Sequence, residues 1–194
     1  MSLLREKRQT EIIEAAMKVF GEYGFYRGKV EDIAKEAGIG KGTIYEYFGS
    51  KKEIFQQMVM YIIDTYFEGL KETVLMEKSI RNKMIGVLNY HSKFIDIHAH
   101  LIERSFYQFE NILKEVKEYI QETDKKVFDF TLQIISEGID GGELDPSIDK
   151  DIATIIFLGI INSGHLKAAI PHDGSLDNIR NDNIVDMVLK GIGK

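Results

Sequence analysis

The sequence predicts an all-α fold, in which a small N-terminal group of helices precedes a larger helical body. Apolar residues recur at helical spacing through most of the 194-residue chain, and no strand-like alternation of useful length is present. The only two prolines, Pro146 and Pro171, both lie in polar, glycine-containing stretches between the apolar stripes. Hydrophobic residues make up 44% and charged residues 29%, which predicts a packed globular protein.

The first predicted helix carries an apolar stripe with charges on its opposite face. The stripe consists of Ile12, Ile13, Ala16, Met17 and Phe20. Gly21 and Gly24 bracket the end of this helix, and Phe25 follows as a hydrophobic contact beyond its terminus.

Two short helices are predicted next, over residues 30–37 and 41–48, separated by a glycine-containing turn. Val30, Ile33, Ala34 and Ala37 form one apolar face of the first, and Ala34 is small enough to let a second helix cross closely. Gly38 supplies the left-handed conformation that reverses the chain, and Ile39 can pack beneath the turn.

A long amphipathic helix is expected after Ser50, a good N-cap residue that forms a capping box with Glu53. Further helices are expected at roughly 79–99, 101–118, 120–138, 149–169 and 178–192. This organisation predicts a helix-turn-helix domain over residues 1–53 and a second helical domain over residues 54–194.

The charge distribution permits a nucleic-acid partner although the net charge is −6. Residues 1–53 carry 10 basic and 9 acidic side chains, whereas residues 54–194 carry 15 basic and 22 acidic ones. DNA binding needs a positive face and not a positive total. The absence of cysteine excludes disulfides and thiolate metal sites. We expect a cytoplasmic protein with no membrane association, because neither a signal peptide nor a spanning apolar run is present.

The helix at 41–48 has the composition of a helix that reads the DNA major groove. Ile44 and Phe48 are predicted to be buried, at i and i+4. Five residues then face outward: Lys41, Gly42, Thr43, Tyr45 and Tyr47. Further cations stand nearby: Arg27, Lys29, Lys51 and Lys52. A helical hairpin that merely packs would explain the apolar residues but not this exposed set, which suits phosphate backbones and base edges.

These segments resemble the TetR-type repressors. The resemblance covers Ile13, Ala16, Phe20, Gly24 and Phe25, then 33–39, 41–48 and 50–53, in unbroken register over about a quarter of the chain. It implies a homodimer that binds a palindromic operator and releases it when the body binds a small-molecule effector. It also implies that Lys41, Gly42, Thr43, Tyr45 and Tyr47 line the DNA face, with Lys52 on a phosphate at the start of the fourth helix.

Two departures from that family pattern concern helix caps. Gly28-Lys29 replaces the Thr or Ser pair that the family usually has before its second helix, so Gly28 would be a weak cap. Arg27 and Lys29 could then contact phosphate by charge. Gly40 stands where the family commonly has Ser. Glu46 either points away from DNA, which we favour, or accepts a hydrogen bond from a cytosine.

Other motifs carry less weight. The stretch 38–43 lacks the strand and the Lys-Ser/Thr pair of a phosphate-binding loop, and 140–151 lacks the ligand spacing of a calcium loop. His91 and His98 can share a helix face, but two imidazoles do not make a chelate, so we expect neither a metal nor another cofactor. No catalytic arrangement is evident, and we expect no enzyme.

The body is predicted to contain an effector pocket and a dimer interface. Aromatic crowding in the middle helices suggests an apolar or amphipathic pocket lined by Tyr90, His91, Phe94, His98, Tyr107 and Phe128. The helix around 152–161 is apolar almost all round and must be buried on more than one side. The resemblance assigns the last two helices to a four-helix interface, with Ile152, Ile156, Gly159, Ile160, Ile184 and Val188 as candidates.

Two alternatives remain open at this point. One is a constitutive or activating DNA-binding protein without a ligand, which would not respond to apolar compounds. The other is an enzyme or carrier built on a helical bundle, which would lack operator affinity.

Overall fold

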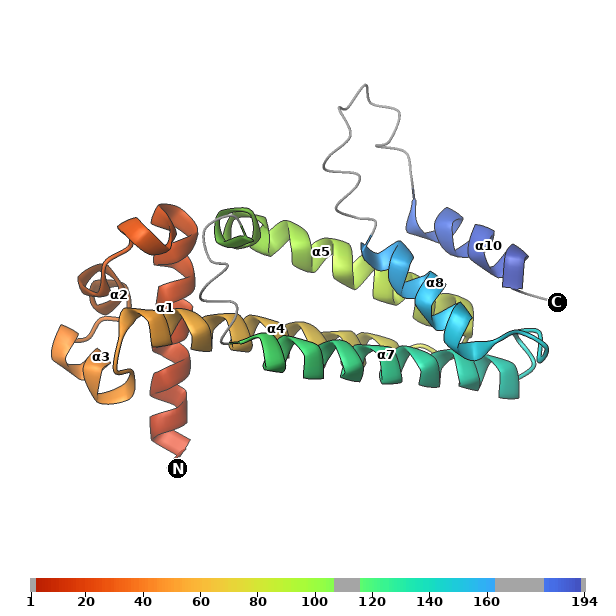
Figure 1. Cartoon of the computed structure of the whole chain (residues 1–194), viewed down its shortest axis with the longest axis horizontal. Helices are drawn as coiled ribbons and strands as arrows, with labels where there is room; N and C mark the ends of the chain where they lie inside the picture. Colours follow the sequence, from red (N-terminus) through yellow and green to blue (C-terminus); the bar gives the residue numbers. More distant parts are fainter. Residues whose placement is uncertain (1–2, 107–115, 163–179, 193–194) are drawn as a thin grey trace, which may run out of the picture. The chain divides into compact units, whose positions relative to one another are not determined.

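The computed structural model describes residues 3–106, 116–162 and 180–192, and all regular structure in them is helical (Figure 1). This confirms the predicted all-α class. The helices are α1 (Leu3–Arg27), α2 (Val30–Glu36), α3 (Lys41–Tyr47), α4 (Lys51–Leu75), α5 (Ile80–Phe106), α7 (Lys117–Asp140), α8 (Lys150–Asn162) and α10 (Asn181–Ile192). Within these described ranges, no helix is long and apolar enough to cross a membrane.

The chain divides into two compact units, which we describe separately. Unit 1 comprises residues 1–65 and 95–121, and unit 2 comprises residues 66–94 and 122–194. The predicted domain boundary after residue 53 stays a prediction, because α4 runs uninterrupted through that position.

Gly24 interrupts the first helix, as the sequence predicted. Its φ of 73° lies in the left-handed region, so α1 is kinked there before its last residues reach Arg27. Phe25 then packs on the apolar cluster below it, with its ring centroid 5.8 Å from that of Phe20. The kink therefore turns the chain towards α2.

The turn between α2 and α3 has the predicted conformation. Gly38 has φ 66°, and its N–H donates to the Lys35 carbonyl at 3.2 Å. The Ile39 N–H donates to the Ala34 carbonyl at 2.9 Å, and the Ile39 side chain packs on the apolar cluster. Together these bonds satisfy carbonyls at the end of α2 and redirect the chain into α3.

One apolar cluster holds α1 to α4 together, and Figure 1 shows α2 and α3 on the same side of α1. Ile33, Ile44 and Ile54 are fully buried in it, and Ala34 is 4% exposed. Burial of each isoleucine side chain stabilises the fold by about 1.5–3 kcal/mol. The small side chain of Ala34 allows the close helix crossing that the sequence indicated.

The capping box at the start of α4 is confirmed with one difference. The Glu53 N–H donates to Ser50 Oγ at 3.1 Å, as predicted. The Glu53 carboxylate accepts from the Gly49 N–H at 2.7 Å, one residue before the usual partner. These two hydrogen bonds satisfy backbone N–H groups at the start of α4, where Lys51 and Lys52 lie.

The expected break near residue 100 is wrong, since α5 continues from Ile80 to Phe106. The next helix was expected from residue 120, but α7 begins earlier, at Lys117. Residues 95–106 contain neither proline nor glycine, so nothing local ends α5 at residue 99.

A second apolar cluster forms the core of unit 2, with residues from α4, α5, α7, α8 and α10. Its most buried members include Met84, Ile135 and Phe157, each at most 1% exposed. The acidic stretch that follows α7 contributes side-chain hydrogen bonds at the start of α8. Asp149 Oδ1 accepts from the Asp151 and Ile152 N–H groups at 3.0 Å each and so caps α8.

Candidate nucleic-acid interface and effector site

The helix α3 has one buried and one exposed side, as predicted. Ile44 and Phe48 are 0% and 2% exposed, whereas Lys41, Gly42 and Tyr45 are exposed. Because α3 has only seven residues, its open side presents few side chains, all close to the turn. Such a short polar-faced helix has the size and chemistry to enter a major groove.

Two of the residues predicted to face solvent are only partly exposed. Thr43 is half-buried, and Tyr47 is half-buried with its ring against the apolar cluster of unit 1. The reason is geometric: α3 packs on two neighbours, so residues beside Ile44 and Phe48 are flanked by them. Tyr47 therefore supports α3 with its ring and reaches solvent only in part.

Lys41, the first residue of α3, is held by an acid on α2. Its Nζ lies 2.5 Å from Glu31 Oε1 and 5.9 Å from the centroid of the Tyr45 ring. The hydrogen bond from Lys41 lowers the pKa of the Glu31 carboxyl, and the same bond raises the pKa of the Lys41 ammonium. Gly40 is the N-cap of α3, and no side chain caps the helix there, as the sequence indicated.

Arg5 contacts the other end of α3, and sequence reasoning missed it. Its guanidinium lies 4.9 Å from the centroid of the Tyr47 ring and donates to the Glu46 carbonyl oxygen at 3.0 Å. A cation at a helix C-terminus is stabilised by the unpaired carbonyls there. Arg5 and Glu46 are 41 positions apart, so the sequence pattern gives no sign of this contact. The Glu46 side chain is exposed, which fits both alternatives for its role.

The junction between α1 and α2 carries Arg27 and Lys29, both exposed. Gly28 is not the cap that we expected, because Lys29 occupies the N-cap position of α2 and makes no side-chain cap bond. Gly28 is required by packing instead: a Cβ there would lie 3.0 Å from the Gly24 carbonyl oxygen and 3.0 Å from a Phe20 ring carbon. The two exposed cations remain available at this corner.

The two lysines that begin α4 differ from each other. Lys51 is turned inward: its Nζ donates to the Tyr26 carbonyl at 3.2 Å and lies 4.7 Å from the centroid of the Phe25 ring. Burial lowers the pKa of the Lys51 ammonium. Lys52 is half-buried at the helix start. Both lysines stay predicted phosphate contacts at this helix start.

An aromatic and polar cluster in unit 2 contains half of the predicted pocket residues. Tyr90, His91 and Phe94 of α5 gather around Tyr66 of α4, with ring centroids 5.0–5.8 Å from the Tyr66 ring. The Tyr66 hydroxyl lies 3.0 Å from His91 Nδ1, and burial raises the pKa of Tyr66 to about 12. Tyr66 was missed because in the sequence it is one more apolar position of a long helix stripe.

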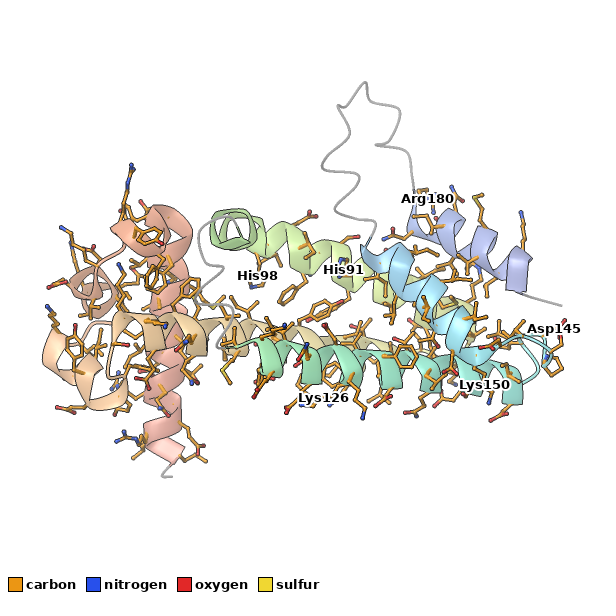
Figure 2. All side chains as sticks on the ribbon, viewed as in Figure 1. His91, His98, Lys126, Asp145, Lys150 and Arg180 are labelled. Carbon is orange, nitrogen blue, oxygen red and sulfur yellow. The ribbon has the colours of Figure 1, made fainter. Side chains whose placement is uncertain are left out.

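The other three predicted pocket residues stay predictions. His98 also lies on α5 (Figure 2) but belongs to unit 1, and Phe128 is half-buried on α7. Tyr107 lies outside the described residues. Gly69 borders the cluster, because a Cβ on it would fall 2.2 Å from the Tyr90 hydroxyl oxygen. The tyrosine ring thus occupies space that only a glycine leaves open.

The outer side of α8 is an exposed apolar stripe. Ile152, Ile155, Ile156 and Gly159 are spaced i, i+3, i+4 and i+7, and the three isoleucines are 57%, 60% and 46% exposed. The opposite side of α8 is buried in the core of unit 2 through Ala153, Phe157 and Ile161.

On α10, Met187 is 75% exposed, and Ile184 and Val188 are half-buried. Ile160 of α8 is also half-buried. The predicted interface residues therefore do lie on α8 and α10, and Ile155 and Met187 extend the set.

The fold and the exposed side of α3 define a helix-turn-helix DNA-binding protein. Residues 12–58 match the family model described as bacterial regulatory proteins of the TetR family. The chain is a TetR-family transcriptional regulator, as the sequence resemblance indicated.

Relatives match over most of the chain. It is 25% identical over 192 residues to the fatty acid metabolism regulator protein of Bacillus subtilis, covering 97% of this chain and 98% of that protein. It is 26% identical over 148 residues to the transcriptional repressor KstR2 of Mycobacterium tuberculosis, covering 75% and 73%. The crystal structure of Bacillus subtilis FadR in complex with stearoyl-CoA matches with a TM-score of 0.67 at 24% identity, covering 93% and 95%. These relatives are transcriptional regulators and not enzymes.

Proposed function

We propose that this protein is a homodimeric repressor that binds a palindromic operator and leaves it when a lipophilic effector binds the body. The observation that carries the proposal is the construction of α3, where Ile44 and Phe48 are buried while Lys41, Gly42 and Tyr45 stay open to solvent. We assign DNA binding to residues 1–53, and effector binding and dimerisation to residues 54–194.

We draw the proposed DNA-facing set from the geometry of unit 1. Tyr45 and Lys41 present a ring and a cation to the groove, and Thr43 offers a hydroxyl from its half-buried position. Arg27, Lys29 and Lys52 supply cations for phosphates on either side. The side chains of Lys51 and Tyr47 also pack within the head, and both stay in the proposed DNA-facing set.

Dimerisation through α8 and α10 is supported by their exposed apolar side chains. A stripe of three large isoleucines at helical spacing is unusual for a surface that faces only water. Two copies related by a two-fold axis would bury the stripe against itself and would present two heads to the two halves of a palindrome.

For the effector we favour a long-chain fatty acyl-CoA. The support is the match over nearly the whole chain to a fatty acid metabolism regulator and to a FadR structure solved with stearoyl-CoA. In this chain, the cluster of Tyr66, Tyr90, His91 and Phe94 offers apolar rings with hydroxyl and imidazole groups among them. Such a mixture suits a lipophilic chain that ends in a polar carbonyl group. His98, Phe128 and Tyr107 stay predictions for the same pocket.

Release of DNA then requires only differential affinity. If the effector binds more tightly to a form whose heads no longer match successive grooves, it shifts the population towards that form. A shift from almost all bound to almost all released needs roughly a 10⁴-fold preference.

A gel-shift assay with the DNA that flanks the protein's own gene tests the proposal. We expect Lys41→Ala and Tyr45→Ala to weaken binding, and Lys126→Ala, which removes an exposed cation of α7 in unit 2, to leave it unchanged (Figure 2). Stearoyl-CoA should release the DNA, and CoA alone should not. Equal binding by all three variants would refute the assigned DNA face. Release by a steroid but not by stearoyl-CoA would refute the assigned effector class.

A further inference from the structure

We infer that Glu31 is a built-in competitor of the DNA backbone: it neutralises Lys41 in the free protein and thereby lowers affinity for all DNA sequences. This inference rests on the proposed DNA-binding role of α3. Glu31 belongs to the first turn of α2 and Lys41 to the first turn of α3, so the helix-turn-helix itself brings them together.

The contact is close but open to solvent. Lys41 Nζ is 2.5 Å from Glu31 Oε1, while the two side chains are 47% and 57% exposed. A buried pair could not be exchanged for a phosphate, but an exposed pair can, because water and salt already compete for it. A phosphate that approaches Lys41 must therefore displace the carboxylate or remain close to it.

Either outcome weakens DNA binding. If the carboxylate leaves, the lost ion pair reduces the gain from the new one. If it stays, it repels the phosphate. Lys29, the N-cap residue of α2, adds to the effect of Lys41 by a smaller electrostatic lowering of the pKa of Glu31. Residues 1–53 carry 10 basic and 9 acidic side chains, which fits a head whose positive face is partly neutralised by neighbouring acids.

The same contact also restrains Tyr45, a proposed DNA-contacting residue of α3. With Lys41 held by Glu31, its ammonium lies 5.9 Å from the Tyr45 ring centroid, within the range of a cation–π contact. Loss of the acid would free Lys41 for a phosphate and would release this restraint on Tyr45. Weak background binding suits a regulator whose effector has to dislodge it from DNA.

The matched control is the neighbouring acid, Asp32. It lies in the same first turn of α2, so Asp32→Asn makes the same change in net charge and in helix-terminus electrostatics as Glu31→Gln. It does not remove the partner of Lys41. A difference between these two variants therefore isolates the ion pair from the general effect of charge.

The test is fluorescence anisotropy with the operator duplex and with an unrelated duplex of equal length, between 50 and 200 mM salt. We expect Glu31→Gln to tighten binding to both duplexes by about twofold to fivefold. The log–log salt slope should steepen by up to about 0.9, the value for one more phosphate contact. Glu31→Ala should behave likewise, Asp32→Asn should change binding less, and Lys41→Ala should abolish the effect of Glu31→Gln.

Several results would overturn the inference. Unchanged binding by Glu31→Gln and Glu31→Ala, or a gain equal to that of Asp32→Asn, would do so. A gain that persists in the Lys41→Ala background would too. If Lys41→Ala weakens binding while Glu31→Gln does nothing, the competitor role alone falls. If Lys41→Ala binds like wild type, Lys41 is not a DNA contact and the inference falls, and the DNA face itself falls only if Tyr45→Ala also binds like wild type.

Discussion

The exposed stripe on α8 makes a quantitative prediction about assembly. Ile155 lies in the middle of the stripe and is 60% exposed in a single chain, although it was not among the residues predicted from the sequence. Ile155→Ala shortens this side chain without touching the core on the opposite side of α8. We expect it to weaken the dimer and to leave the fold of each protomer unchanged.

The size of the effect follows from the exposed fraction. Ile→Ala removes three carbon groups, worth about 2.4 kcal/mol if all were buried, at about 0.8 kcal/mol each. Since 60% of the side chain is available to a partner, about 1.5 kcal/mol is lost per protomer. A two-fold axis places the change in the interface twice, so the total is about 3 kcal/mol, or roughly a 100-fold rise in the dimer Kd.

Sedimentation over a series of protein concentrations measures this constant. Leu75→Ala is a suitable control, because Leu75 is 78% exposed near the end of α4 and loses the same number of carbon groups. The control should dimerise like wild type. Circular dichroism should show the same helix content in all three proteins. An unchanged dimer constant for Ile155→Ala, or a wild type that is monomeric throughout, would refute the assignment of this stripe to the interface.

Four further predictions concern the head and the aromatic cluster. Gly28→Ala should destabilise the head by about 1–3 kcal/mol in urea unfolding, because its Cβ meets a carbonyl oxygen and a ring carbon at 3.0 Å each; Gly42→Ala, with no neighbouring atom within 4 Å, should not be destabilising. Lys52→Ala should flatten the salt slope of DNA binding by about 0.9, and an unchanged slope would remove Lys52 from the phosphate contacts. Burial raises the pKa of Tyr66 to about 12, so the folded state keeps the phenolic proton while the unfolded chain loses it near pH 10. The free energy of unfolding therefore falls as pH rises from about 10 to 12, by at most about 1.4 kcal/mol per pH unit. Tyr66→Phe should lack this fall, and equal urea midpoints for both proteins across that range would contradict the assignment. Gly69→Ala should displace Tyr90, whose hydroxyl lies 2.2 Å from the added carbon, and so weaken the response to stearoyl-CoA while operator binding persists; an unaltered response would place the effector elsewhere.

Helix identity and the helix-turn-helix were determined by the sequence alone, because the information is local. The spacing of Ile44 and Phe48 decides which side of α3 is buried, and Gly38 permits the left-handed turn with φ 66°. The cap at Ser50 and the apolar nature of α8 are equally readable, since each depends on residues a few positions apart. The length of α5 could not be read from the sequence, because no residue near position 99 forces the helix to end or to continue.

Only the tertiary structure decided which charged and aromatic side chains meet. The contacts of Arg5 with Glu46 and Tyr47, of Lys41 with Glu31, and of Tyr66 with His91 join residues that lie 10 to 42 positions apart. The inward turn of Lys51 onto Phe25 was likewise not readable from the sequence. A long flexible side chain carries no record of its partner in the local pattern, and its partner is fixed by distances that exist only once the helices have packed.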